Sequence, residues 1–156
     1  MHANAKLLTE FYEAFAEHDG DAMAACYHDE AQFTDPVFPD LDADGVRSMW
    51  RMLTGDADDL RIECSGIEAD GESGQAHWEA WYTFSKTGRK VHNVIDASFE
   101  FREGKIVRHV DDFDFWRWSR QALGLPGLFL GWTPILQNKV RQTAAARLAR
   151  WRDGTI

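Results

Sequence analysis

One carboxylate of this chain stands where it could transfer protons. Asp35 lies in the segment Phe33-Thr34-Asp35-Pro36, after two short amphipathic helices that the preceding residues predict. The segment leads into the hydrophobic part of the chain, where an acid loses water, is harder to ionise and can exchange protons near neutral pH. An Asp before Pro is also a common turn former, because its side chain accepts hydrogen bonds from nearby amides. Asp35 is therefore a candidate catalytic residue and equally a candidate turn residue.

A second polar side chain lies within the predicted strand Lys90–Phe101. Alternation along this strand puts five residues on one face, which we assign to the core: Asn93, Ile95, Ala97, Phe99 and Phe101. Asp96 belongs to the other face, which we expect to meet solvent or a second subunit. Asn93 is thus a polar group among apolar neighbours. It could bind a ligand, or it could hold a strand edge.

The next predicted strand, Ile106–Phe115, has no purely apolar face. Alternation groups five of its residues on one side: Val107, His109, Asp111, Phe113 and Phe115. His109 could share a proton with Asp35 or with Asp111. A buried His that binds a neighbouring carboxylate for structural reasons is an equal alternative. A bulge in the strand would reverse the assignment of faces.

Some of these side chains are also of metal-binding types. His92, His109, Asp111 and Asp112 could ligate zinc or non-haem iron, but alternation places them on both faces of the sheet, so we expect no metal. The sequence has no Gly-rich phosphate loop, no Gly-x-Ser-x-Gly elbow and no Cys/His nucleophile pattern. We therefore expect chemistry without an organic cofactor.

The composition is typical of one globular domain. The chain has 156 residues, of which 44% are hydrophobic, including ten Phe and seven Trp, and this is enough to fill a sizeable core. Cys26 and Cys64 stand apart without Cys-x-x-Cys spacing, so we interpret both as reduced core residues. Acidic residues precede any apolar run long enough for a signal peptide, which predicts a cytoplasmic protein. The longest apolar stretch, Leu123–Leu136, is broken by Gly and Pro and falls short of the roughly 20 residues that span a bilayer.

Charge is unevenly distributed along the chain. The net charge is −9, yet residues 117–156 hold seven Arg or Lys and one Asp, a balance of +6 that leaves −15 on residues 1–116. An acidic body repels nucleic acid, and the basic residues of the tail lack the aromatic interleaving of a base-stacking surface. We therefore expect no nucleic-acid partner. Packing of the tail on the body, or on a partner's body, is the simpler interpretation.

Periodicity predicts helices first and a sheet second. The apolar face of the first helix contains Leu7, Leu8, Phe11, Tyr12 and Phe15. Asp19 can cap a second helix that ends at Cys26, and a third helix follows Asp42 or Asp44. After Gly55 the period becomes two, in the candidate strands Leu60–Ile67, Gln75–Phe84, Lys90–Phe101 and Ile106–Phe115. Short turns between alternating strands imply an antiparallel sheet and an α+β domain with helices on one face.

The tail combines an apolar loop with a basic amphipathic helix. After Trp116-Arg117-Trp118 the chain runs through Gly and Pro residues into a last helix, whose apolar face contains Leu136, Val140, Ala144, Leu148 and Trp151. This helix could close a pocket, extend a dimer interface or bind an anionic membrane. We favour docking on protein, because the helix is tied to a compact domain. We divide the chain into a pocket domain, 1–118, and a C-terminal extension of the same domain, 119–156.

Four segments taken together resemble a known family. They are Phe11-Tyr12-Glu13-Ala14, Tyr27-His28-Asp29-Glu30-Ala31, Phe33-Thr34-Asp35-Pro36 and Arg102-Glu103-Gly104-Lys105-Ile106-Val107-Arg108-His109. Their order resembles the nuclear transport factor 2-like (NTF2-like) superfamily, and its SnoaL-like branch most closely, over about residues 5–118. The resemblance implies a cone-shaped α+β barrel, in which three N-terminal helices pack on a curved antiparallel sheet around a hydrophobic pocket. Such domains are usually dimers, so we expect a homodimer.

The resemblance also implies roles for particular residues. In ketosteroid isomerases, members of the superfamily, a carboxylate base moves the proton, and Asp35 matches that base. Phe11 matches the isomerase tyrosine and has no hydroxyl, which argues against ketosteroid isomerisation. Either Asp96 or Ala97 falls at the isomerase's second acid, and alternation favours Ala97. Asp111 falls where SnoaL-type polyketide cyclases keep their general acid/base.

Aromatic residues would line the pocket that the resemblance implies. Besides Phe11, the candidates for ligand contact are Trp50, Trp78, Tyr82, Phe99 and Phe113. Aromatic residues at such spacing are also typical of a core.

The sequence leaves three classes of function open. The first is a cofactor-independent acid/base enzyme of the isomerase, cyclase or dehydratase type, acting on a small apolar carbonyl compound. Asp35 would abstract or relay a proton, Asp111 with His109 would return it, and Asn93 would orient an oxygen of the substrate. The second is a non-catalytic carrier of a hydrophobic ligand, and the third is a dimeric interaction module. Two carboxyls that face one apolar pocket would favour the enzyme. A pocket whose acids are engaged in structural hydrogen bonds would favour the carrier, and a cavity filled by side chains would favour the interaction module.

Overall fold

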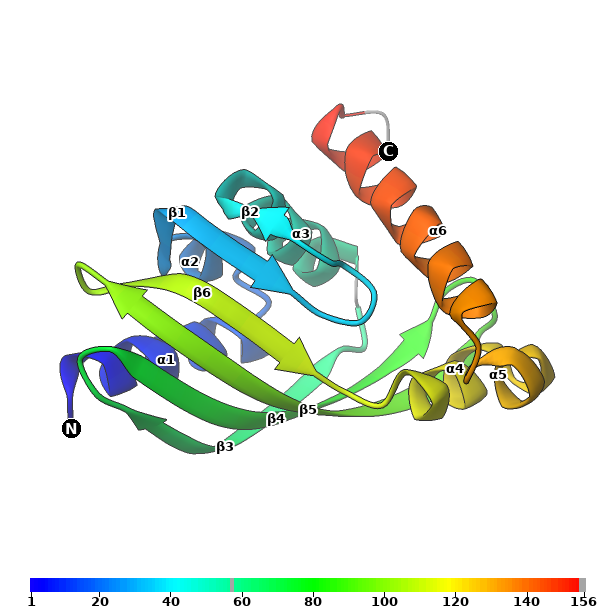
Figure 1. Ribbon diagram of the computed structural model, residues 1–156, viewed down its shortest axis with the longest axis horizontal. Helices are drawn as coiled ribbons and strands as arrows, with labels where there is room; N and C mark the ends of the chain where they lie inside the picture. The colour runs from blue at the N-terminus through cyan, green and yellow to red at the C-terminus, as the bar shows by residue number, and fades with distance from the viewer. Residues whose placement is uncertain (57, 155–156) are drawn as a thin grey trace.

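Helices cover one face of a curved sheet, and the last helix runs across the same side (Figure 1). A computed structural model describes residues 1–56 and 58–154. The helices are α1 (Ala3–Ala16), α2 (Gly20–Ala24), α3 (Ala43–Asp56), α4 (Phe115–Leu123), α5 (Leu125–Leu130) and α6 (Pro134–Arg152). The strands are β1 (Tyr27–Thr34), β2 (Leu41–Asp42), β3 (Arg61–Ala69), β4 (Ser73–Phe84), β5 (Arg89–Arg102) and β6 (Lys105–Asp112). The α+β class and the three N-terminal helices are confirmed.

The sheet is mixed, with strand order β2-β1-β6-β5-β4-β3. Neighbouring strands are antiparallel except for β1, which runs parallel to β6. The sequence prediction of a wholly antiparallel sheet missed β1 and the short β2. A register shift between Tyr27 and Gln32 explains the omission of β1, because it breaks the alternation of buried and exposed residues on which the prediction depended.

Hydrophobic packing between α1, α3 and the sheet forms the core. The side chains of Leu8, Phe11, Val46 and Met49 are almost completely buried there, and each contributes about 1.5–3 kcal/mol by leaving water. Asp19 caps α2 as expected, because its carboxylate accepts a hydrogen bond from the Ala22 amide. Asn93 and the apolar residues predicted to share its face of β5 are all buried, which confirms that alternation.

The segment that follows the sheet is helical. The sequence analysis instead extended the last strand to Phe115 and predicted a loop after Trp118. β6 ends at Asp112, and the carboxylate of Asp114 accepts a hydrogen bond from the Arg117 amide to cap α4. The predicted division of the chain after residue 118 falls inside α4. The short α5 escaped prediction because Pro126, a residue that usually interrupts helices, lies in its first turn, where no backbone donor is needed.

The last helix returns from α5 toward α3 (Figure 1). Its expected apolar side faces the domain: Leu148 is buried, and Leu136, Val140, Ala144 and Trp151 are partly buried. Within residues 1–56 and 58–154, no helix has both the length and the apolar character required to cross a bilayer.

Candidate active site

An apolar cavity of about 380 Å³ lies between the sheet, α3 and α6. Its volume is within the range of small-molecule sites, roughly 300–1,000 Å³. Seven of the residues singled out from the sequence line it: Asp35, Trp50, Trp78, Tyr82, Asn93, Asp111 and Phe113. The remaining walls are mainly apolar, so the two carboxyls and Asn93 are polar exceptions. The interaction-module hypothesis requires a cavity that is filled by side chains, and this cavity is not filled.

Asp35 forms a turn and borders the cavity at the same time. Its Oδ1 accepts hydrogen bonds from the amides of Val37 at 2.7 Å and Phe38 at 2.6 Å, an Asx turn of the kind that Asp-Pro predicts. The hydrogen bonds that its carboxyl accepts from the described residues all end on Oδ1, so Oδ2 is left for a ligand. Burial raises the pKa of the Asp35 carboxyl from 3.8 to about 7, and the Asp111 charge adds to the rise, against the opposing effects of the two amides and Arg141.

Asp111 is the second carboxyl of the cavity and is held by two side chains. His109 Nε2 lies 2.8 Å from Asp111 Oδ1, and Trp78 Nε1 donates to the same oxygen at 3.3 Å. Asp111 is only 3% exposed and His109 only 1%. As for Asp35, these contacts use one carboxyl oxygen. Each acid therefore combines a structural role with a second oxygen that no described residue binds.

A chain of hydrogen bonds continues from Asp111 into the core. Beyond His109, Nδ1 lies 2.8 Å from the hydroxyl of Tyr27, and that oxygen accepts from Trp50 Nε1 at 2.8 Å. Because indole only donates, the Tyr27 hydroxyl proton is free to point at Nδ1, which leaves the imidazole proton on Nε2, facing Asp111. The chain fixes the orientation of His109 and gives Asp111 a proton partner away from solvent.

Phe11 and Phe99 lie behind the cavity and do not line it. Phe11 is fully buried, and its ring meets the rings of Tyr27, Trp50 and His109 edge-on. The Phe99 ring centre is 4.3 Å from that of His109. Both rings therefore pack around the imidazole of His109, which itself reaches the cavity through Asp111. Sequence periodicity could identify these residues as interior but could not separate wall from core.

Tyr27 gains a role that its sequence context did not reveal, and Tyr82, already a candidate for ligand contact, gains a specific one. Tyr27 lies 82 positions from His109 in the chain, and only the parallel pairing of β1 with β6 brings them together. Tyr82 lines the cavity, and its hydroxyl accepts a hydrogen bond from Trp118 Nε1 at 2.7 Å. Burial raises the pKa of Tyr82 to about 12, so the group keeps its proton. Tyr82 is therefore available as a hydrogen-bond donor to a ligand.

The last helix completes the cavity wall. Its residues on the cavity are Leu136, Lys139, Val140, Thr143, Ala144 and Arg147. Gln137 and Arg141 both donate to the Pro36 carbonyl, beside Asp35, at 3.1 and 2.9 Å. Arg147 donates to Asp56 of α3 at 2.6 Å. This helix therefore closes one side of the pocket, which is one of the roles that the sequence left open for the tail.

The residues considered as metal ligands do not come together. His92 binds Glu79 at 2.7 Å on the outer side of the sheet, whereas His109 and Asp111 lie inside. Asp96 is exposed on that outer side and binds His77, as expected for the solvent-facing strand positions. Among the residues that the structure describes, no group of three or more His, Cys, Asp or Glu side chains is arranged to hold a metal ion.

The match to a family model agrees with the fold and with the position of the cavity. Residues 8–109 match the model of the SnoaL-like domain, which is more than half of the chain. The chain belongs to the SnoaL-like family. The match includes Asp35 and Asn93 and ends at His109, so α4, α5 and α6 lie outside it. A search of the curated proteins found no significant match.

Solved structures show the same NTF2-like fold. An NTF2-like protein of unknown function from Burkholderia pseudomallei is similar at 19% identity with a TM-score of 0.68, over 79% of this chain and 99% of that one. A candidate polyketide cyclase from Xanthomonas campestris pv. campestris is similar at 21% identity with a TM-score of 0.64, over 76% of this chain and 96% of that one. TerC, crystallised with polyporic acid, is similar at 17% identity with a TM-score of 0.60, over 72% of this chain and 92% of that one. The similarity to these structures establishes the fold.

Proposed function

We propose that this SnoaL-like protein is a cofactor-independent acid/base enzyme that acts on a small, largely apolar carbonyl compound held in the cavity. The observation that carries the proposal is the position of Asp35, whose carboxyl borders an apolar cavity with one oxygen unbound and a pKa of about 7. A base is most effective when its pKa lies near the working pH. A cyclase, isomerase or dehydratase reaction would each use such a group.

In the proposed reaction, Asp35 removes a proton from the carbon next to the carbonyl group of the substrate. The electron pair moves onto the carbonyl oxygen, which needs a donor. Tyr82 supplies one, because its own oxygen already accepts from Trp118 and its proton is free. The amide of Asn93, which lines the same cavity, supplies a second. Tyr82 thus takes the role that Phe11 cannot fill.

Asp111 and His109 return the proton in this scheme. The imidazole proton on Nε2 is shared with Asp111 Oδ1, and Asp111 lines the cavity, where its Oδ2 would carry the proton that is returned to the substrate. The cycle closes when Asp35 releases the proton that it removed and Asp111 takes one up, both on the cavity side, while His109 and Tyr27 keep their protons and hold the Asp111 carboxyl in place. The two carboxyls of the cavity have different surroundings, because Asp35 accepts from two backbone amides and Asp111 accepts from Trp78 and contacts His109.

A non-catalytic carrier is the second candidate, favoured by the hydrogen bonds that both acids make within the protein. Asp35 accepts from two amides and Asp111 from Trp78 and His109, so each has a structural reason to be present. TerC, which shares the fold, was crystallised with polyporic acid. The carrier hypothesis predicts ligand binding that is indifferent to the charge of Asp35.

Exchange of carbon-bound protons separates the two candidates. Cyclic ketones and aromatic polyketide-like compounds are first screened by thermal shift, since binding stabilises the folded state. A bound ketone is then incubated with the protein in D₂O, and loss of the proton next to its carbonyl group is followed by ¹H NMR. We expect native protein to accelerate exchange at least tenfold over the same buffer without protein, and Asp35→Asn to lose this acceleration while binding the ketone equally.

Asp112→Asn serves as the matched control, because Asp112 is exposed and adjacent in sequence to Asp111. It should exchange the ketone at the native rate. Equal binding by native protein and Asp35→Asn, with no exchange by either, would support the carrier instead. The homodimer that the resemblance implies is measured separately by light scattering.

A further inference from the structure

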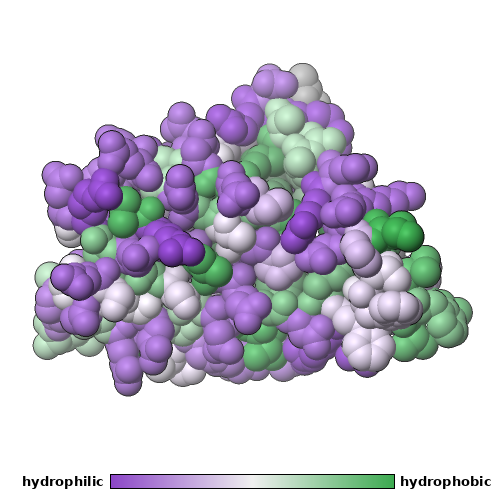
Figure 2. Space-filling view, in the orientation of Figure 1, coloured by the Kyte–Doolittle hydropathy of each residue, from purple (hydrophilic) through white to green (hydrophobic). Residues whose placement is uncertain are grey.

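Six large apolar side chains remain exposed at one end of the molecule. They lie on α5, in the turn that follows it and at the start of α6, and we call them the apolar tip: Leu125, Leu128, Phe129, Leu130, Trp132 and Ile135. Ile135 is 77% exposed and Trp132 is 71% exposed. Figure 2 shows this hydrophobic surface at the right-hand end, over α5. In the described residues, the other exposed large apolar side chains are Met1 and Trp116. A patch of this kind marks a contact surface.

The α5 part of the apolar tip packs closely against α4. A Cβ atom on Gly127 would overlap the Ser119 carbonyl, and one on Gly131 would overlap the Ser119 hydroxyl, so the two helices meet at their backbones. Trp116 Nε1 also donates to the Leu128 carbonyl at 3.1 Å. Because Gly127 and Gly131 lie against α4, the large apolar residues of α5 are on the outside.

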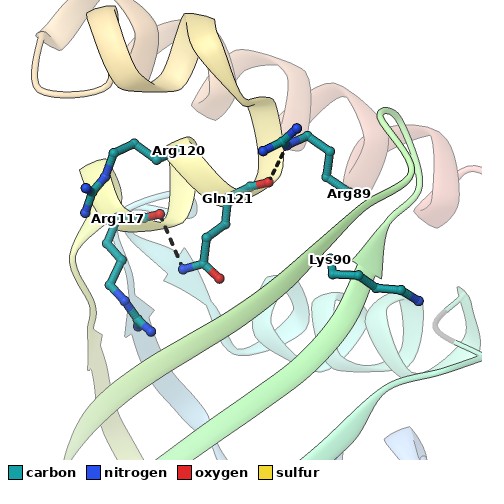
Figure 3. A pocket seen from close by; sticks show the side chains of 5 residues that line it. All are labelled: Arg89, Lys90, Arg117, Arg120 and Gln121. Atoms are coloured by element: carbon teal, nitrogen blue, oxygen red, sulfur yellow. Dashed lines mark hydrogen bonds between the residues drawn. The ribbon is translucent and has the colours of Figure 1, made fainter.

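A basic groove adjoins the apolar tip. It is a shallow hollow of about 640 Å³ along α4 and β5, and its lining residues are Arg89, Lys90, Arg117, Arg120 and Gln121 (Figure 3). The Arg120 guanidinium stacks 4.4 Å from the centre of the Trp116 ring, whose indole binds α5. The groove and the apolar tip are thus connected through Arg120 and Trp116.

The arginines of the basic groove have no acidic partners within the described part of the chain. Lys90 lies 3.6 Å from Asp59, but Arg89 and the other two arginines form no ion pair there. Arg89 binds the Gln121 carbonyl, and Nε of Arg120 is buried without a hydrogen-bond partner. Three uncompensated guanidinium groups in a protein of net charge −9 indicate that this surface meets an anionic partner.

We propose that the apolar tip and the basic groove dock the protein on the surface of a membrane that contains anionic lipids. Apolar side chains beside cations match the two layers of such a surface, acyl chains below and phosphate groups above. The apolar tip lies at the end of the long axis, so it meets a flat surface before the rest of the body does (Figure 1).

A second copy of the chain fits this surface less well than a membrane does. A stable protein interface uses roughly 20–30 residues on each side. The apolar tip and basic groove together contain 11 residues, at a projecting end. The proposed docking is independent of catalysis in the cavity.

Vesicle flotation with the full chain tests the proposal. We expect native protein to float with vesicles of 70% phosphatidylcholine and 30% phosphatidylglycerol and to bind pure phosphatidylcholine at least tenfold more weakly. Removing two charges in Lys90→Gln/Arg117→Gln should weaken binding about 30-fold. The control Arg102→Gln/Arg108→Gln removes two exposed arginines at the opposite end of the sheet and should bind as the native protein does.

A second pair of variants tests the apolar contribution. Leu125→Gln/Phe129→Gln should lose vesicle binding, and Trp132→Gln/Ile135→Gln should repeat the result at other positions if the first pair folds poorly by circular dichroism. Failure of native protein to float with the anionic vesicles, or full binding by both pairs, overturns the proposal. So does a native dimer by light scattering that Leu125→Gln/Phe129→Gln converts to monomer, because the apolar tip would then be an interface between copies.

Discussion

Replacing Asp35 by Asn should change the way in which stability depends on pH. The carboxyl has a pKa of about 7 in the folded protein and about 3.8 when exposed. Between these values the folded state holds a proton that the unfolded chain has released. Because the folded state binds more protons, the contribution of this carboxyl to the free energy of unfolding is greatest at low pH. That contribution is lost as the pH rises through 7.

The size of the effect follows from the shift. Each pH unit below the folded pKa contributes about 1.4 kcal/mol, so the native free energy of unfolding should gain about 2.7 kcal/mol from this group between pH 8 and pH 5. Asn has no proton to take up, yet its side-chain oxygen can still accept from the amides of Val37 and Phe38. Asp35→Asn should therefore be more stable than the native protein at pH 8, and this advantage should shrink by about 2.7 kcal/mol at pH 5.

Urea unfolding at pH 5, 6, 7 and 8, followed by Trp fluorescence, measures this difference. The native protein, Asp35→Asn and the exposed control Asp112→Asn are compared at each pH. The control should run parallel to the native protein, since its carboxyl is solvated in both states. If Asp35→Asn also runs parallel to the native protein, the carboxyl is not desolvated, and the reasoning from burial to pKa is refuted.

Three further predictions concern the relay, the cavity and the last helix. Tyr27→Phe should lower the free energy of unfolding by about 1–3 kcal/mol, since His109 Nδ1 loses its buried partner; an unchanged urea midpoint would contradict this. Ala144→Phe should weaken binding of any cavity ligand at least tenfold with little change in melting temperature, because position 144 lies on the cavity wall; undiminished affinity by calorimetry would count against the site. Arg141→Met removes a hydrogen bond to the Pro36 carbonyl and should speed amide hydrogen exchange in the last helix, whereas equal exchange would show that this contact does not hold α6.

Regular alternation and helical periodicity made much of the fold predictable. The core face of β5 and the cap of α2 followed from residue spacing alone. The failures occurred where the local pattern was broken or short. β1 contains a register shift after Tyr27, and α5 is a six-residue helix with Pro126 in its first turn. In such segments tertiary packing, rather than local sequence, decides the structure.

The candidate site was predictable in part for a similar reason. Strand parity placed Asn93 on the interior side, the resemblance to SnoaL-type polyketide cyclases singled out Asp111, and the Asp-Pro motif identified Asp35, and all three line the cavity. The partners of these residues were not predictable, because their contacts are long-range. The bond between Tyr27 and His109 and the contribution of α6 to the cavity wall depend on how the elements pack.

Titration of the Asp35 carboxyl by ¹³C NMR is the most direct test of the central claim, that the fold places a proton-transfer group in an apolar cavity. The resonance is assigned by its absence from the spectrum of Asp35→Asn and is followed from pH 3 to pH 9. We expect a midpoint near pH 7, in agreement with the pKa of about 7 that burial produces. A midpoint near pH 4 would contradict the account, because Asp35 would then be a solvated turn residue, ionised throughout the physiological range.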